Sequence, residues 1–121
     1  MPDRWYDHWP LQGEAVTPEE DGSAAVATLF GEGVSPRLAA IAEREKLKAT
    51  FGNLTLVHYG VNRSLQHAAY PAKRQALLNE SNLHLNRDLM QLEHWDEEAI
   101  TRRGRAMFEV ALRVWPGPER A

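Results

Sequence analysis

Two asparagines flank a short apolar stretch in the segment FGNLTLVHYGVN, residues 51–62. Asn53 stands near its beginning and Asn62 at its end, nine positions later. Asparagine carbonyl oxygens bind hard divalent cations such as Mg²⁺, and asparagine side chains also stabilise turns and cap helices. Metal binding is therefore the chemistry that this pair could serve, and turn formation is the structural alternative.

The residues around the asparagines must position them. Segment 53–59 is apolar and partly β-branched, with a glycine on each side, which predicts one strand. A helix is expected from about Asn62, and Pro71 must break that helix or open a second one. Nucleases of the ββα-metal type use this order of strand, turn and helix. In them a neutral histidine takes a proton from the attacking water, and a cation binds the scissile phosphate.

The remaining elements follow from caps and composition. Ser35 followed by proline predicts a helix over 36–49. Asp96 is expected to cap a helix that runs to about Trp115. Segment 82–92 fits a strand or a helix, and residues 12–33 are rich in Gly, Pro, Glu, Asp and Ser, which indicates a long loop.

These elements predict an α+β fold, a mostly helical domain around a small ββα-metal (HNH-like) core with a long N-terminal loop. The length of 121 residues indicates a single domain over 1–121, with an irregular segment over 1–34 and the core over 35–118. The chain has no cysteine, which excludes a disulfide framework and thiolate metal sites and fits a cytoplasmic location.

Charge and hydropathy exclude other classes. No apolar run approaches the about 18 residues of a membrane span, and no signal-peptide pattern opens the chain, so no membrane partner is expected. A net charge of −3 argues against nucleic-acid binding by bulk charge. Local basic pairs such as Lys73 and Arg74 can still contact phosphate, although solvated helix faces look the same.

Several separate blocks stand in order along the chain: GNLTLVHYGVN, Leu65, Tyr70, Lys73-Arg74, Ser81, Leu85-Asn86-Arg87, WDEEAI, Arg103 and ALRVWPGP. Together they resemble the C-terminal HNH domain of the GmrSD-type, modification-dependent (type IV) restriction endonucleases. The similarity runs from about Met1 to Pro118. The resemblance implies a DNA endonuclease with Mg²⁺ or Mn²⁺ as cofactor and DNA, modified or not, as substrate. It also implies an N-terminal nucleotide-binding, DNA-handling region as partner.

The resemblance assigns roles by position. Asn53 matches the strand asparagine of the family and is expected to be catalytic. Asn62 matches the position at the helix start that ligates the metal. Lys73 and Arg74 are expected to contact the DNA phosphate. Trp95 and Trp115 are expected to be packing residues at the two ends of the last helix.

Two alignments place the general base differently. The catalytic histidine of the family lies in a Glu-His-Val-Met-Pro-Gln-like motif, ahead of a Trp-x-x-His-Trp-Pro segment. Trp5, His8 and Trp9 fall on that second segment, so Met1-Pro2 would be the tail of the motif, and its histidine would precede the chain. A misplaced start codon or a degenerate gene remnant would explain this arrangement.

The other alignment takes Asp7 as a metal ligand and His8 as the base, since adjacent residues of a strand point to opposite sides. The first alignment fits better, because Pro10 comes one residue too early for a His-x-x-Pro pattern. A third possibility is a helical partner-binding module without metal or catalysis.

Overall fold

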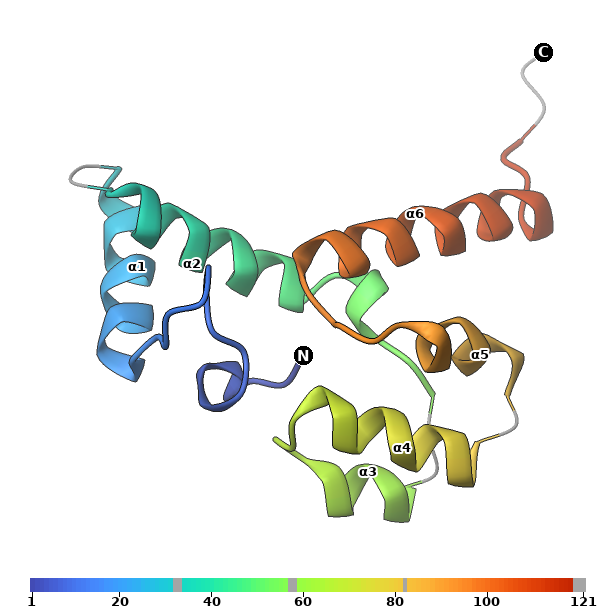
Figure 1. The fold of residues 1–121 in the computed structure, drawn as a ribbon. Helices are drawn as coiled ribbons and strands as arrows, with labels where there is room; N and C mark the ends of the chain where they lie inside the picture. Colours follow the sequence, from blue (N-terminus) through green and yellow to red (C-terminus); the bar gives the residue numbers. More distant parts are fainter. Residues whose placement is uncertain (32–33, 57–58, 82, 119–121) are drawn as a thin grey trace.

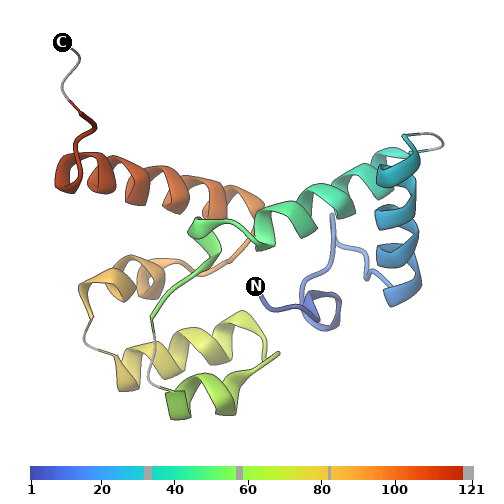
Figure 2. The same cartoon turned by 180° about the vertical axis from the view of Figure 1, so that it is seen from behind.

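The computed structural model describes residues 1–31, 34–56, 59–81 and 83–118. The elements in chain order are η1 (Trp5–Asp7), α1 (Pro18–Phe30), α2 (Pro36–Lys48), η2 (Phe51–Asn53), α3 (Tyr59–Leu65), α4 (Tyr70–Glu80), α5 (His84–Gln91) and α6 (Glu97–Val114). α1 packs on α2, α3 on α4, α4 on α5, and η2 lies against α6 (Figure 1). The N-terminus lies between the α1–α2 pair and the α3–α4 pair, as Figure 2 shows from behind.

The described residues contain no β-strand, so the structure does not contain the predicted strand over 53–59. Asn53 ends the short helix η2, and α3 already begins at Tyr59, while residues 57–58 lie outside the described part. The backbone between these points has side-chain partners in place of a second strand. Arg103 donates to the carbonyls of Gly52 and Leu54, and Asn86 donates to the carbonyl of Leu56. The fold of the described residues is therefore helical, and the ββα core is not seen in them.

The predicted loop over 12–33 is also wrong, because α1 occupies most of it. Thr17 and Glu20 form a capping box, in which each side chain accepts from the other residue's backbone N–H. Gly31 ends the helix in the left-handed region, with φ of 68°. The Thr-Pro-Glu-Glu sequence at 17–20 is the signal for this helix.

The helices predicted from their caps are confirmed. Ser35 accepts from the N–H of Leu38 at the start of α2, and Asp96 accepts from the N–H of Ala99 at the start of α6. Pro71 lies in the first turn of α4 and thus opens a second helix. Segment 82–92, which fitted a strand or a helix, contains α5.

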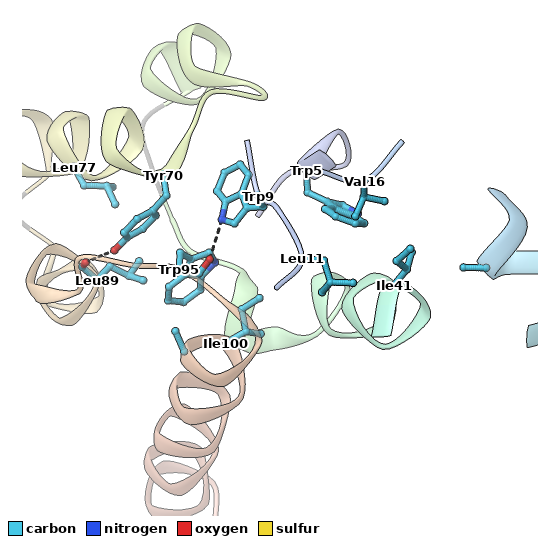
Figure 3. Close-up of a cluster of buried hydrophobic side chains, with 12 residues drawn as sticks. Trp5, Trp9, Leu11, Val16, Ile41, Tyr70, Leu77, Leu89, Trp95 and Ile100 are labelled. Atoms are coloured by element: carbon cyan, nitrogen blue, oxygen red, sulfur yellow. Dashed lines mark hydrogen bonds between the residues drawn. The ribbon is translucent and has the colours of Figure 1, made fainter. Parts of the chain in front are cut away.

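Aromatic residues from distant segments form the core (Figure 3). Trp5 is fully buried, and Trp9 donates its indole N–H to the carbonyl of Trp95 at 2.8 Å. The guanidinium of buried Arg44 lies over the Trp5 ring, 4.7 Å from its centre, donates to the carbonyl of Trp9 and pairs with Glu97. These contacts tie the N-terminal segment to α2 and α6. Trp95 is buried as predicted, whereas the predicted packing of Trp115 is wrong, because its side chain is exposed after the end of α6.

A close backbone contact joins η2 to α6. Gly52 is buried, and a Cβ atom built on it would lie 2.1 Å from the carbonyl oxygen of Ile100 and 2.9 Å from the amide nitrogen of Gly104. Only glycine allows this approach.

None of the helices in the described residues is long and apolar enough to cross a membrane.

We predict that Gly52→Ala destabilises the protein by at least about 2 kcal/mol, because overpacking against backbone cannot be relieved by a rotamer change. Gly104→Ala is the matched control. A Cβ there would meet Gly52 atoms only at 3.5 Å, and alanine is the better helix former by about 1 kcal/mol, so its stability should be unchanged or higher. Denaturant unfolding measures both, and equal effects would contradict the proposed contact.

Candidate functional site

A cavity of about 360 Å³ lies between η2, α3, α4, α5 and α6. The described residues that line it are Met1, Asn53, Leu54, Thr55, Asn62, Leu65, Tyr70, Lys73, Leu77, Leu89, Trp95 and Arg103. Its size lies within the range of about 300–1,000 Å³ that is usual for ligand pockets. We refer to it as the Asn53 cavity.

Asn53 is held by four hydrogen bonds. Its Oδ1 accepts from the amino group of Met1 at 2.7 Å and from the indole N–H of Trp95 at 2.9 Å. Its Nδ2 donates to the carbonyls of Met1 at 2.8 Å and Lys48 at 2.9 Å. A carboxamide has two acceptor sites and two donor hydrogens, so all of them are used. In this arrangement Asn53 positions its neighbours, and its predicted catalytic role remains a prediction.

Arg103 and Trp95 fix the wall around Asn53. Arg103 Nη1 donates to the carbonyl of Gly52 at 2.8 Å and to that of Leu54, the residues on either side of Asn53. The Trp95 ring stacks on Tyr70, with 5.9 Å between ring centres, and the Tyr70 hydroxyl donates to the carbonyl of Leu89 at 2.6 Å (Figure 3). The wall therefore combines η2 with α4, α5 and α6.

Asn62 and Lys73 line the same cavity from α3 and α4. The structure thus brings together three residues that the sequence singled out, although they come from separate elements. Asn62 is exposed and Lys73 is half-buried. Burial lowers the pKa of Lys73 from its ordinary value, which means that its charge is incompletely solvated. Their metal and phosphate roles remain predictions.

The other predicted site residues do not line this cavity. Asp7 is exposed and pairs with Arg4 at 3.2 Å. The exposed His8 has its ring edge-on to Trp9, with 6.4 Å between ring centres. Arg74 donates its Nε to the carbonyl of Met90 at 2.6 Å, which ties α4 to α5. The lining of the Asn53 cavity therefore gives no support to Asp7 as a metal ligand, His8 as a base or Arg74 as a phosphate contact.

The Asn53 cavity offers few donors for a cation. Its described lining includes no carboxylate and no histidine, and the described residues contain no group of three or more His, Cys, Asp or Glu that could hold a metal. Asn62 supplies an amide oxygen, and His58, the histidine within the predicted strand 53–59, lies outside the described residues. Mg²⁺ is usually held by one or two carboxylates together with water and substrate phosphate. The residues therefore fit a divalent cation only in part.

The charged groups that do line the cavity are cationic. Arg103 is 9% exposed, and its Nη2 is buried without a hydrogen-bond partner in the described structure. Burial lowers its pKa, and the carboxylate of Asp88 opposes that shift. Burial, with Lys73 and Lys48 nearby, lowers the pKa of the Met1 amino group to about 5, so this amine is mostly neutral at neutral pH, and the cations of the described lining are Arg103 and Lys73. The cavity is thus suited to an anion.

Arg103 is the site residue that sequence reasoning missed. It was noted as a matching position but was given no role. Ile100, Arg103 and Met107 follow one another at helical spacing, so the arginine falls within the apolar stripe of α6. A charged residue in such a stripe is buried only when its donors find partners. The position of Arg103 within this stripe was therefore the signal in the sequence that could have indicated a buried arginine with hydrogen-bond partners.

One comparison with known proteins gave a match. The model of the family described as GmrSD restriction endonucleases, C-terminal domain, matches residues 3–110. No curated protein and no solved structure matches.

We predict that Asn53→Asp lowers the free energy of unfolding by about 2–4 kcal/mol, because a carboxylate would replace the amide donor that faces two carbonyls. Asn62→Asp is the control at the other asparagine. Asn62 is exposed, so its change should stay within about 0.5 kcal/mol. Thermal and denaturant unfolding at neutral pH measure the difference. Equal stabilities of the two variants would show that Asn53 is not the anchor of this site.

The lowered pKa of Lys73 predicts a dependence of stability on pH. Between the folded-state pKa and 10.5 the unfolded chain binds more protons at this lysine than the folded chain, so stability gained from Lys73 rises with pH in this window. The melting temperature of wild type relative to Lys73→Met should therefore increase from pH 8 towards pH 10.5. Tyr70, Arg103 and the Met1 amine share the cavity and are common to both proteins. A pH-independent difference would contradict the burial of the charge.

Proposed function

The chain belongs to the family of GmrSD restriction endonuclease C-terminal domains, and on this premise we propose that it is an HNH-type DNA endonuclease domain that hydrolyses phosphodiesters with a divalent cation. The nuclease assignment comes from the family, whereas the reaction in this chain, its HNH type and its metal dependence are the proposal. The substrate is DNA, and an N-terminal nucleotide-binding, DNA-handling region is the proposed partner.

The observation that carries the proposal is the shared cavity of Asn53, Asn62 and Lys73. In phosphodiester hydrolysis water attacks phosphorus, negative charge builds up on the phosphoryl oxygens, and the 3′ oxygen leaves. Lys73, which lines this cavity, is proposed to balance that charge, and its incomplete solvation would strengthen the interaction. Asn53 keeps the wall of the cavity in place through its contacts with Met1 and Trp95.

A divalent cation, Mg²⁺ or Mn²⁺, would stabilise the charge of the phosphate and of the leaving oxygen. Of the described residues, Asn62 is the one we propose as a direct ligand, through its amide oxygen. Water and the substrate phosphate would complete the shell. Asp7, which was considered as a ligand on sequence grounds, would need to leave its ion pair with Arg4.

The general base is proposed to be a histidine joined to the N-terminal side of Met1, with His8 as the alternative. Met1 lines the Asn53 cavity and its nitrogen touches Asn53, so residues attached to it would enter the same space. The family motif read as Glu-His-Val-Met-Pro supplies such a histidine. His8 is not among the residues that line the cavity.

The test is nicking of supercoiled plasmid DNA by two proteins, the 121-residue chain and the same chain with Glu-His-Val placed before Met1. We expect the extended protein to nick DNA with Mg²⁺ or Mn²⁺ and to stop in EDTA. Lys73→Met should lower its rate about a hundredfold, as does loss of one charge-stabilising donor in other enzymes. Lys46→Met, at an exposed position of α2, should leave the rate unchanged.

The outcomes separate the alternatives for the base. Nicking by the unextended chain that is lost in His8→Ala would assign the base to His8. Nicking that requires the added histidine would assign it to the upstream motif. Folded proteins that never nick DNA under any metal condition would refute the nuclease proposal.

A partner-binding module without catalysis is the second candidate. It is favoured by the C-terminal half of α6, where Phe108 is 61% exposed, and by Trp115 directly after this helix, which is 74% exposed. A groove of about 720 Å³ runs between α5 and α6, with Phe51, Met107 and Val110 among its apolar lining. Absence of nicking together with no retention on DNA at low salt would favour this candidate.

A further inference from the structure

We infer that Asn86 is a positioning residue of the proposed nuclease site, and that it acts by holding the chain between Asn53 and Asn62. The inference rests on the proposed function, because a positioning role requires a site to be positioned. It goes further in giving a role to α5. This helix supplies Leu89 to the Asn53 cavity but none of the residues proposed for binding or catalysis.

The segment 54–56 cannot be held by apolar packing alone. It leads from η2 towards α3, and Leu54 and Thr55 line the Asn53 cavity. The side chain of Leu54 is 54% exposed and that of Leu56 is 68% exposed, so both gain little from burial. The described residues contain no strand that could pair with this segment. Hydrogen bonds from side chains are therefore its main restraint.

Asn86 provides this restraint from α5. Its Oδ1 accepts from the hydroxyl of Thr55, and its Nδ2 donates to the carbonyl of Leu56 at 3.0 Å and to the hydroxyl of Ser81 at 2.8 Å. A carboxamide carries the same C=O and N–H groups as a peptide unit, so Asn86 takes the place of a neighbouring strand. Its side chain is fully buried, and a lost partner would leave polar atoms unpaired away from water.

Arg103 and Asn86 hold successive parts of the same chain. Arg103 donates from α6 to the carbonyls of Gly52 and Leu54, on either side of Asn53. Asn86 binds the two residues that follow, on the side of α3. Loss of Asn86 should therefore leave Asn53 in place and release the part of the chain that separates it from α3.

This separation should affect the chemical step more than the binding of DNA. Asn62 on α3 is the proposed cation ligand, and a displacement of a reacting group by about 1 Å can lower a rate about a hundredfold. Asn86 is not among the described residues that line the cavity, so its removal takes no group away from the DNA. We therefore expect kcat to fall while KM changes little.

Nicking kinetics of the chain extended by Glu-His-Val, with Mg²⁺, test the inference. Asn86→Ala should lower kcat by about tenfold or more and leave KM within about twofold. Thr55→Val is close in shape, keeps the protein folded if Asn86→Ala does not, and should also lower kcat. Because both changes remove the same bond, the double variant should lose no more than Asn86→Ala does. Asn79→Ala, at an exposed position of α4, is the control and should nick as the wild type does.

Proteolysis of the folded protein is a second measurement that does not depend on DNA cleavage. Chymotrypsin cuts after leucines in segments that open locally, and the exposed Leu54 and Leu56 offer such sites. Cutting within 54–56, located by mass spectrometry, should be about tenfold faster in Asn86→Ala, the equivalent of one lost hydrogen bond to a buried group. Asn79→Ala should be cut at the wild-type rate.

Unchanged cutting within 54–56, an unchanged kcat, a loss confined to KM, or additive losses in the double variant would each overturn the inference. In these cases the activity of the extended wild type would leave the nuclease proposal standing. Absence of nicking by every protein would instead refute the nuclease proposal, and faster cutting of Asn86→Ala would still confirm that Asn86 holds the segment.

Discussion

The docking of η2 on α6 is the constraint on which the rest of the structure depends. Gly52 lies so close to Ile100 and Gly104 that no side chain fits at position 52. Arg103, on the same face of α6, closes the contact by donating to the carbonyls on both sides of Asn53. Because Asn53 is fixed in this way, it can hold Met1 and Trp95, and the cavity acquires a definite wall. A helix that approached less closely would leave the carbonyls of Gly52 and Leu54 without the guanidinium of Arg103.

The same contact explains which part of the fold the sequence could and could not predict. α2 and α6 depend on local sequence, and the cap residues Ser35 and Asp96, each directly before its helix, predict where these helices begin. α1 is equally local, and Thr17 with Glu20 carries its signal, but the prediction of a loop rested on the Gly, Pro and acidic content of the segment alone. The segment after Asn53 is different, because its conformation depends on side chains 30 to 50 positions away. Alternating apolar residues indicate an extended chain but not what pairs with its backbone.

The residues of the candidate site likewise include some that the sequence could predict and one that it could not. Asn53, Asn62 and Lys73 could be selected from residue type and family position, and they do line one cavity. The sequence could not predict which of them have free polar atoms. The four hydrogen bonds of Asn53 in the structure show that its side chain has no free lone pair or donor. Arg103 was not predicted, because an arginine in a helix is usually exposed to solvent. Its burial follows from carbonyls that lie about fifty positions earlier in the chain, which no local pattern contains.

The charge of the Asn53 cavity also bears on the order in which its ligands would assemble. Lys73 and Arg103 generate a positive potential in a partly desolvated space, and like charges repel most strongly where water is excluded. A divalent cation entering alone would meet this potential with the amide oxygen of Asn62 as its protein ligand. A phosphate group entering alone would meet the ammonium group of Lys73 and, in the described lining, no carboxylate. Once the phosphate is bound, its outer oxygens offer the hard, negative ligands that the described lining lacks. Phosphate first and cation second is therefore the order that the electrostatics of this cavity favour.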